Sequence, residues 1–266
     1  MSGDLDTGQS ARPRIAIPEP TSTLPDYNQR CWPQYAKAIE ACGGIPVAVP
    51  LRETPAEMAR LISTCSAALL PGSPADVHPQ KYGRETLPEC ALPDPLREAA
   101  DELLLQDAFN LHKPLLGICY GLQALNVWRN GSLIQHLSGE PIHHDAGPEV
   151  LEAHVVEIPV TSTLGGLLAD AADLEPVNEL ARLATNSSHH QAIESPGDGL
   201  AIVARSMEDG VIEALEGRTP EHWIIGVQWH PERTLRESPA SEALFQAFVA
   251  AARAWQPRPI QESIAR

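Results

Sequence analysis

KPLLGICYGLQALNVWRNGSLIQHL (residues 113–137) is the stretch that decides the fold of this 266-residue chain. An apolar run over 114–118 predicts a buried strand, and a helical pattern follows it with no loop between them. At the corner, Cys119 stands between Gly117 and Gly121. Because a free cysteine is commonly a small buried hydrophobe, packing is one interpretation of Cys119. A nucleophile held at a strand-to-helix elbow is the other.

The spacing Gly-x-Cys-x-Gly has a physical use at such a corner. Flanking glycines let the strand and the helix approach each other without clashes between Cβ atoms. The helix would direct unpaired N–H groups and the positive end of its dipole at the sulfur, which favours the thiolate. The amide of Tyr120 would also face a developing oxyanion. Taken alone, this motif does not separate a nucleophile from a packed thiol.

A cysteine nucleophile needs a base, and the run IIGVQWHPER (224–233) offers one. His230 and Glu232 are two residues apart, so they project to the same side of an extended backbone. Glu232 would accept a hydrogen bond from one imidazole nitrogen and leave the other to face Cys119. A lone surface histidine is the alternative, and the carboxylate two residues later favours the catalytic interpretation.

The segment TNSSHHQAI (185–193) is rich in small polar groups, which suits recognition of a polar substrate; an ordinary turn is the alternative. We also considered a metal site that would combine two pairs of adjacent histidines. Adjacent histidines lack the spacing that converges on one ion, so we expect no metal. The four histidines are His143, His144, His189 and His190.

The order of apolar runs predicts an α/β fold. Short strands alternate with helical patterns, such as that over 31–44, and the strands are apolar throughout. This favours three layers, α/β/α, around a mostly parallel central sheet, with ligands beyond the carboxyl ends of the strands. Period-two alternation in the second half predicts a smaller strand-rich part. We expect one domain over 13–256, between a disordered tail (1–12) and a polar C-terminal tail (257–266).

Composition excludes several classes of function. The chain has 19 Lys and Arg against 35 Asp and Glu, a net charge of −16, which argues against nucleic-acid binding. The same charge mildly favours cationic or amine-bearing ligands. No apolar run approaches the roughly 18 residues of a membrane span, and no signal peptide is recognisable. Five cysteines without CxxC spacing indicate neither a disulfide framework nor a zinc–thiolate site, so we expect a reducing cytoplasm.

Three motifs, GICYGLQALNV, NSSHHQA and GVQWHPE, occur in this order, and the similarity extends over nearly the whole chain. Together they resemble the class I glutamine amidotransferase fold, which is flavodoxin-like. More narrowly, the chain is similar to the stand-alone γ-glutamyl hydrolases typified by γ-glutamyl-γ-aminobutyrate hydrolase. The resemblance implies a Cys-His-Glu triad, which falls on Cys119, His230 and Glu232, and it implies no cofactor.

The function that this resemblance implies is hydrolysis of a small γ-glutamyl amide through a glutamyl thioester, in polyamine catabolism. Backbone amides of Tyr120, Gly72 and Ser73 are expected to form the oxyanion hole. For Gln123 a plain position on the helix surface is the alternative to substrate binding. The expected substrate-binding residues are Gln123, Asn186, Ser187, Ser188 and His189.

Two departures from the hydrolase pattern bear on specificity. An arginine commonly follows the nucleophile in the subfamily, and here the residue is Tyr120. The oxyanion loop that usually reads Pro-Gly-Gly is Pro71-Gly72-Ser73. If residue 120 contacts the leaving group, the loss of the positive charge predicts a preference for neutral or cationic amines over γ-aminobutyrate (GABA).

Two other functions remain open from the sequence. The chain could be a glutaminase subunit that delivers ammonia to a separate synthetase, or a non-catalytic sensor of a γ-glutamyl metabolite. Hydrolysis of glutamine only beside a partner would favour the first, and binding without turnover the second. The sequence leaves the oligomeric state, including a homodimer, undetermined.

Overall fold

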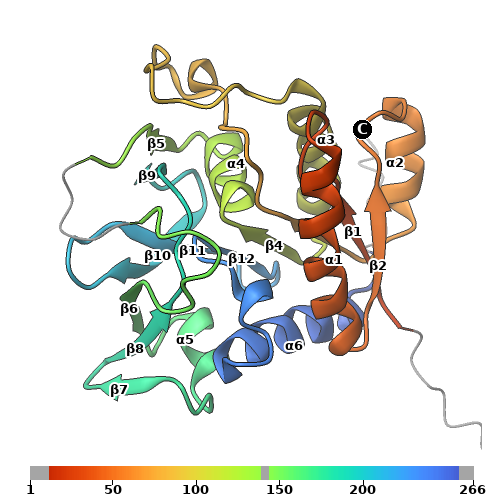
Figure 1. Ribbon diagram of the computed structural model, residues 1–266. Coiled ribbons are helices and arrows are strands. Elements are labelled where there is room, and N and C mark those ends of the chain that lie inside the picture. Colours follow the sequence, from red (N-terminus) through yellow and green to blue (C-terminus); the bar gives the residue numbers. More distant parts are fainter. Residues whose placement is uncertain (1–11, 139–143, 258–266) are drawn as a thin grey trace, which may run out of the picture.

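The computed structural model describes residues 12–138 and 144–257. Twelve strands form one sheet, and their order is β2-β1-β3-β4-β12-β11-β10-β6-β8-β7, with β9 pairing β11 and β5 (Figure 1). The strands are β1 Arg14–Pro18, β2 Ile45–Val49, β3 Ala67–Leu70, β4 Leu115–Ile118, β5 Ser132–Ile134, β6 His154–Pro159, β7 Glu175–Val177, β8 Leu180–Thr185, β9 Ala192–Ser195, β10 Leu200–Ser206, β11 Ile212–Gly217 and β12 Ile224–Val227.

The first half of the sheet is parallel and the second half is antiparallel. Strands β2, β1, β3, β4 and β12 pair in parallel. From β12 onward, through β11, β10, β6, β8 and β7, every pairing is antiparallel. The predicted α/β fold with a mostly parallel centre and a strand-rich second half is therefore confirmed.

Helices cover both faces of the sheet and bury one apolar cluster on each (Figure 1). α1, α5 and α6 pack on one face, where Tyr35 and Phe245 belong to the core. α2, α3 and α4 pack on the other, where Leu104 and Leu122 do. The helices are α1 Pro25–Ala41, α2 Pro55–Ser63, α3 Pro95–Leu111, α4 Tyr120–Trp128, α5 Thr163–Leu168 and α6 Pro239–Ala254, with 3-10 turns η1 Pro79–Tyr82 and η2 Pro231–Arg233.

Local sequence explains where several helices begin. Thr54 and Glu57 form a capping box at α2, and Pro55 occupies the first turn, where its missing N–H costs nothing. α1 begins at Pro25, six residues before the apolar pattern that predicts it. No residue of its first turn is buried, so no apolar periodicity marks it. The long segment 72–95, between β3 and α3, contains only η1 before α3 starts at its last residue.

The parallel arrangement positions the site. Because the carboxyl ends of parallel strands meet at one edge of a sheet, the segments after β3, β4 and β12 lie side by side. The predicted tails fall almost wholly outside the described residues, so the boundaries of the domain stay a prediction.

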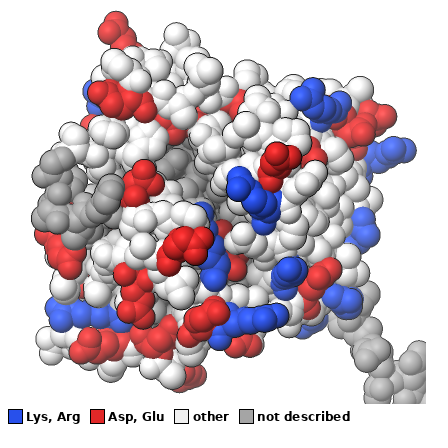
Figure 2. All heavy atoms as spheres, in the orientation of Figure 1, with Lys and Arg blue, Asp and Glu red and all other residues white. Residues whose placement is uncertain are grey.

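The described part of the chain bears on the expectations about nucleic-acid binding and membrane spans. Asp and Glu side chains lie across the face drawn in Figure 2, with Lys and Arg interspersed, and the described part of this face shows no continuous basic patch. Within the described chain, no helix combines the length and apolar character needed to cross a bilayer.

Candidate active site

The elbow exists as the sequence predicts. β4 ends at Ile118, α4 begins at Tyr120, and Cys119 between them has φ 52° and ψ −109°. A positive φ is strained for a residue with a side chain and persists only where the surroundings enforce it. Here the Cys119 amide donates to the Val227 carbonyl at 2.8 Å. A Cβ added at Gly121 would lie 2.0 Å from the Leu70 carbonyl oxygen, so only glycine lets α4 pack this close to β3.

The base and its orienting group follow β12. His230 Nδ1–H donates to Glu232 Oε1 at 2.8 Å, and both side chains are buried. Burial by itself lowers the pKa of His230, but the Glu232 carboxylate and the Cys119 sulfur outweigh it and raise the pKa to about 9. Burial raises the pKa of Glu232, and the neighbouring imidazole more than offsets this and lowers it.

The loop after β3 closes the site. A Cβ added at Gly72 would lie 2.9 Å from His230 Cε1 and 3.7 Å from Cys119 Cβ, so three strand ends converge here. The Gly72 amide already donates to the buried Tyr35 hydroxyl of α1 at 3.1 Å. The expected oxyanion role of Gly72 therefore needs correction, since this N–H has an acceptor within the protein. Sequence reasoning missed Tyr35, whose helical position indicates only packing.

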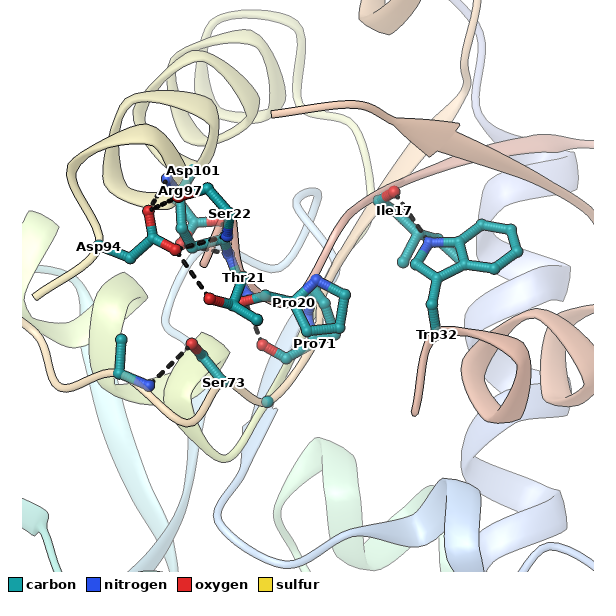
Figure 3. A network of polar contacts seen from close by, with 12 residues as sticks. Ile17, Pro20, Thr21, Ser22, Trp32, Pro71, Ser73, Asp94, Arg97 and Asp101 are labelled. Atoms are coloured by element: carbon teal, nitrogen blue, oxygen red, sulfur yellow. Dashed lines mark hydrogen bonds and ion pairs between the residues drawn. The ribbon is translucent and has the colours of Figure 1, made fainter. Parts of the chain in front are cut away.

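A buried arginine fixes the same loop (Figure 3). Arg97 of α3 is 0% exposed and donates through Nη2 to the Pro71 carbonyl at 2.6 Å. Its Nη1 donates to the Pro20 carbonyl at 2.8 Å, and its Nε pairs with Asp101 at 2.8 Å. Arg97 thus joins the segments after β1 and β3 to α3. Asp94, which caps α3, accepts from the amide and hydroxyl of Ser22 and strengthens the same junction.

The predicted substrate residue Gln123 lies inside the protein. Its side chain is buried, and Nε2 donates to the Gln191 carbonyl at 3.1 Å and to Gln228 Oε1 at 3.2 Å. The alternative of a helix-surface residue is wrong, because β9 and β12 cover this side of α4. Two protein acceptors for its amide also disfavour a substrate role.

The predicted segment 186–189 reaches the site mainly by holding His230. Asn186 donates through Nδ2 to the His230 carbonyl at 2.9 Å and accepts from the His230 amide at 2.8 Å. Ser187 donates to the His144 carbonyl at 2.6 Å. Asn186 therefore positions the backbone of His230, and with it the imidazole. The polar character of the segment did not reveal this role.

Two basic side chains that the sequence did not assign to this site, Arg233 and His190, lie beside the triad residues. Arg233 donates through Nη1 to Ser188 Oγ at 2.7 Å, and its Nε lies 3.8 Å from Glu232 Oε1. His190 Nε2 lies 3.2 Å from Asp76 Oδ1. The bond to Asp76 raises the pKa of His190, and the Cys119 sulfur adds to the rise. Their signal in the sequence is adjacency to the HPE and NSSH motifs.

Tyr120 points away from the reacting atoms. Its ring is 1% exposed and packs under Arg97, with the guanidinium carbon 4.8 Å from the ring centroid. Burial raises the pKa of its phenol well above the usual value. The specificity prediction was conditional on contact between this side chain and the leaving group, and the burial of the ring against Arg97 disfavours that contact.

Of the described histidines considered for a metal, His190 lies apart from His144 and His189. His189 and His190 are adjacent, so their side chains diverge: His190 meets Asp76, while His189 Nε2 lies 3.5 Å from Glu213. His144 and His154 lie beside Glu213 as well. His143 lies outside the described residues.

Comparison with known proteins fixes the family. The model of the Peptidase C26 family matches residues 15–232, most of the chain. The chain belongs to the Peptidase C26 family. It is 32% identical to the γ-glutamyl-γ-aminobutyrate hydrolase of Escherichia coli over 229 residues, which cover 82% of this chain and 84% of that protein. It is 34% identical to a candidate glutamine amidotransferase of Mycobacterium tuberculosis, and the match covers 85% of this chain and 69% of that protein.

Membership of Peptidase C26 makes the chain a glutamine-amidotransferase-like hydrolase. A candidate GMP synthase component from Thermoplasma acidophilum has a similar structure, with a TM-score of 0.58 over 91% of this chain and 94% of that one. The two are 13% identical, so this likeness concerns the fold alone. The predicted resemblance to the γ-glutamyl hydrolases is confirmed at the level of the family.

Proposed function

We propose that this Peptidase C26 hydrolase cleaves the γ-glutamyl amide bond of small γ-glutamyl amines, with Cys119 as the nucleophile. The observation that carries the proposal is the 2.8 Å bond from His230 to Glu232 beside the strained elbow that holds Cys119. The similarity to the E. coli γ-glutamyl-γ-aminobutyrate hydrolase supports the substrate class. Such an activity would belong to polyamine catabolism in the cytoplasm.

The reaction has two halves. The Cys119 thiolate attacks the γ-carbonyl carbon, the C–N bond breaks, and protonated His230 gives its proton to the leaving amine. The glutamyl group is then a thioester on Cys119. His230, held by Glu232, takes a proton from water, the hydroxide attacks the thioester, and glutamate leaves as the thiolate returns.

Backbone amides would stabilise the oxyanion in both halves. Tyr120 is the first residue of α4, and amides in a first helical turn have no acceptor within the helix. The Ser73 amide is the second donor that we propose, because Gly72 donates to Tyr35. These donors require no side chain, so the change from Gly-Gly to Gly-Ser leaves them in place.

The glutamyl end of the substrate needs a cationic partner for its α-carboxylate. Arg233 is suited to this because a guanidinium matches a carboxylate with two parallel hydrogen bonds. Its side chain is 16% exposed, next to Glu232 and Ser188. We therefore assign Arg233, with Ser188, to the α-carboxylate, and leave Asn186 and Gln123 as residues that position others.

Release of glutamate from a panel of γ-glutamyl amides tests the proposal. The panel contains γ-glutamyl-GABA, a γ-glutamyl-polyamine, a γ-glutamyl peptide, a polyglutamyl folate and free glutamine. We expect turnover of at least one small γ-glutamyl amine by the wild type. We expect none by the Cys119→Ala and His230→Ala variants, whose native circular dichroism spectra would show that they are folded. Hydrolysis of glutamine alone, or binding without turnover, would reject the proposal in favour of a glutaminase or a sensor.

A further inference from the structure

A second cluster of chemically active side chains lies in the strand-rich half, and the proposed reaction does not use it. His154 starts β6, Glu213 lies in β11, and His144 and His189 lie in the loops before β6 and after β8. All four are buried, and Glu213 is 0% exposed. This histidine–glutamate cluster consists of His144, His154, His189 and Glu213.

Glu213 lies at distances from the three histidines that suit ligands of one ion. Glu213 Oε1 lies 3.4 Å from His144 Nδ1, 3.4 Å from His154 Nε2 and 3.5 Å from His189 Nε2. These separations exceed the usual length of about 2.7–3.2 Å for an N–H···O bond. Around a zinc ion with ligands at about 2.0–2.1 Å, the corners of a tetrahedron are about 3.4 Å apart. His144, His154 and Glu213 offer ligand atoms that all lie within 4.8 Å of one another.

Outer partners turn two of the rings toward the centre. His144 Nε2–H donates to Asp209 Oδ2 at 2.8 Å, so its Nδ1 lone pair faces Glu213. His189 Nδ1–H donates to the Gln191 carbonyl at 2.9 Å, so its Nε2 lone pair faces Glu213 as well. Histidines that bind metals are held in this way, with the remote N–H on a carboxylate or a backbone carbonyl.

Most of the atoms that face the centre have no other partner among the described residues; the exception is His154 Nε2, which lies 3.5 Å from Thr185 Oγ1. His144 Nδ1, His189 Nε2 and both carboxylate oxygens of Glu213 are buried without a hydrogen bond in the described structure. Leaving a buried carboxylate and imidazole lone pairs unsatisfied is costly. A cation among these electron pairs would satisfy all of them at once.

We propose that the histidine–glutamate cluster binds one divalent transition-metal ion, with Zn²⁺ as the ion that best suits imidazoles and a carboxylate. His144, His154 and Glu213 are the three ligands whose atoms all lie near one another. His189, which lies 3.5 Å from Glu213 but outside that set, would move in as the fourth ligand and close the site. The ion would join the loop before β6, the start of β6, the segment after β8, and β11. The segment after β8 also carries Asn186, which positions His230.

Metal binding by untagged, chelator-treated full-length protein tests this proposal. After Zn²⁺ is added back and unbound metal is dialysed away, we expect about one Zn²⁺ per chain by elemental analysis. With Co²⁺ in its place, we expect the intense visible bands of tetrahedral coordination, and we expect Zn²⁺ to displace them. Less than about a tenth of an equivalent of Zn²⁺, or the weak visible spectrum of octahedral Co²⁺, would overturn the proposal.

Three variants separate this site from adventitious binding. Glu213→Gln keeps the size of the side chain but removes a charged ligand, so Co²⁺ affinity should fall more than 100-fold. Asp209→Asn should lower affinity about 10–100-fold and keep the tetrahedral spectrum, because it changes only an outer partner. His136→Gln, a half-buried histidine outside the cluster, should bind as the wild type does. Equal affinity in Glu213→Gln and His136→Gln would reject the site; if Glu213→Gln does not fold, the wild-type stoichiometry and spectrum decide.

Discussion

At the scale of single residues, the site depends on conformations and charges that only a few side chains provide. Cys119 is held at a positive φ, and the pKa of His230 is raised to about 9 by the Glu232 carboxylate and the neighbouring Cys119 sulfur. Burial raises the pKa of the other four cysteines and so opposes their ionisation. Reactivity is therefore expected to concentrate at one thiol.

Alkylation tests this difference among the cysteines. Burial raises the pKa of the thiols of Cys31, Cys65 and Cys90, and that of Cys42 to about 11. At neutral pH, iodoacetamide should therefore modify Cys119 first, measured by peptide mass spectrometry against time, because the thiolate is the reacting form. Cys119→Ala should abolish turnover and Cys42→Ala should not. Equal labelling rates at all five cysteines would contradict the prediction.

The charge state of His230 gives a second prediction. Its pKa of about 9 in the folded protein exceeds the ordinary 6.5, so its protonated form stabilises the fold fully below pH 6.5. That contribution is lost as the pH rises through 9. Glu232→Gln removes the main group that raises this pKa, so NMR titration of the ring nitrogens should show a lower value. The variant should also lose less unfolding free energy between pH 6.5 and 9. An unchanged His230 titration in Glu232→Gln would show that the carboxylate does not hold the proton.

At the scale of the elements, close packing at the strand ends builds the site. α4 approaches β3 because residue 121 has no side chain, and the loop after β3 is held by a buried arginine of α3. The strand ends supply three separate chemical groups at one edge of the sheet. Their spacing depends on the helices packed behind them.

Two glycines in helices form a matched pair for this packing. A Cβ at Gly121 would lie 2.0 Å from a backbone oxygen, whereas at Gly166 of α5 no described atom lies within 4 Å. Gly121→Ala should therefore lower the melting temperature strongly and abolish activity, because backbone must move. Gly166→Ala should gain about 0.5–1 kcal/mol from lower backbone entropy in the unfolded chain. Calorimetry checks both, and similar stability of the two variants would contradict the packing argument.

The buried ion pair of Arg97 makes another comparison possible. Arg97 and Asp101 are 0% and 3% exposed, whereas the Arg84 and Glu194 side chains are 53% and 42% exposed. Arg97→Gln should cost about 3–5 kcal/mol of unfolding free energy, because it leaves a buried carboxylate without its partner. Arg84→Gln should cost less than about 1 kcal/mol. Urea unfolding measures both, and a small loss in Arg97→Gln would show that the loop after β3 does not depend on this arginine.

At the scale of the whole molecule, net charge is the property that acts beyond contact distance. The chain carries −16, so it attracts cationic substrates over a distance set by salt. The kcat/KM for a γ-glutamyl-polyamine should fall as ionic strength rises from about 0.01 to 0.15 M, across which the Debye length shortens from about 30 to 8 Å. The kcat/KM for γ-glutamyl-GABA should stay level or rise. The same salt response for both substrates would exclude steering.

The sequence by itself determined the local features: the strand-to-helix elbow at Cys119, the His230–Glu232 pair, the order of apolar strands and the family. Each is written in contiguous residues, because a strand, a turn or an i, i+2 pair needs only its own neighbourhood to be recognised. The two glycines that flank Cys119 are visible in the sequence, and they permit the close approach of β4, α4 and β3 at the elbow.

Only the tertiary structure decided which distant residues share a site. Tyr35 meets Gly72, Arg97 meets Pro71, and His144 meets Glu213 across 37, 26 and 69 positions. No periodicity links such residues, because β-pairing and helix packing set their distances. For Gln123 and Tyr120 the sequence predicted the position beside the elbow but not the direction of the side chain. That direction depends on what packs against α4.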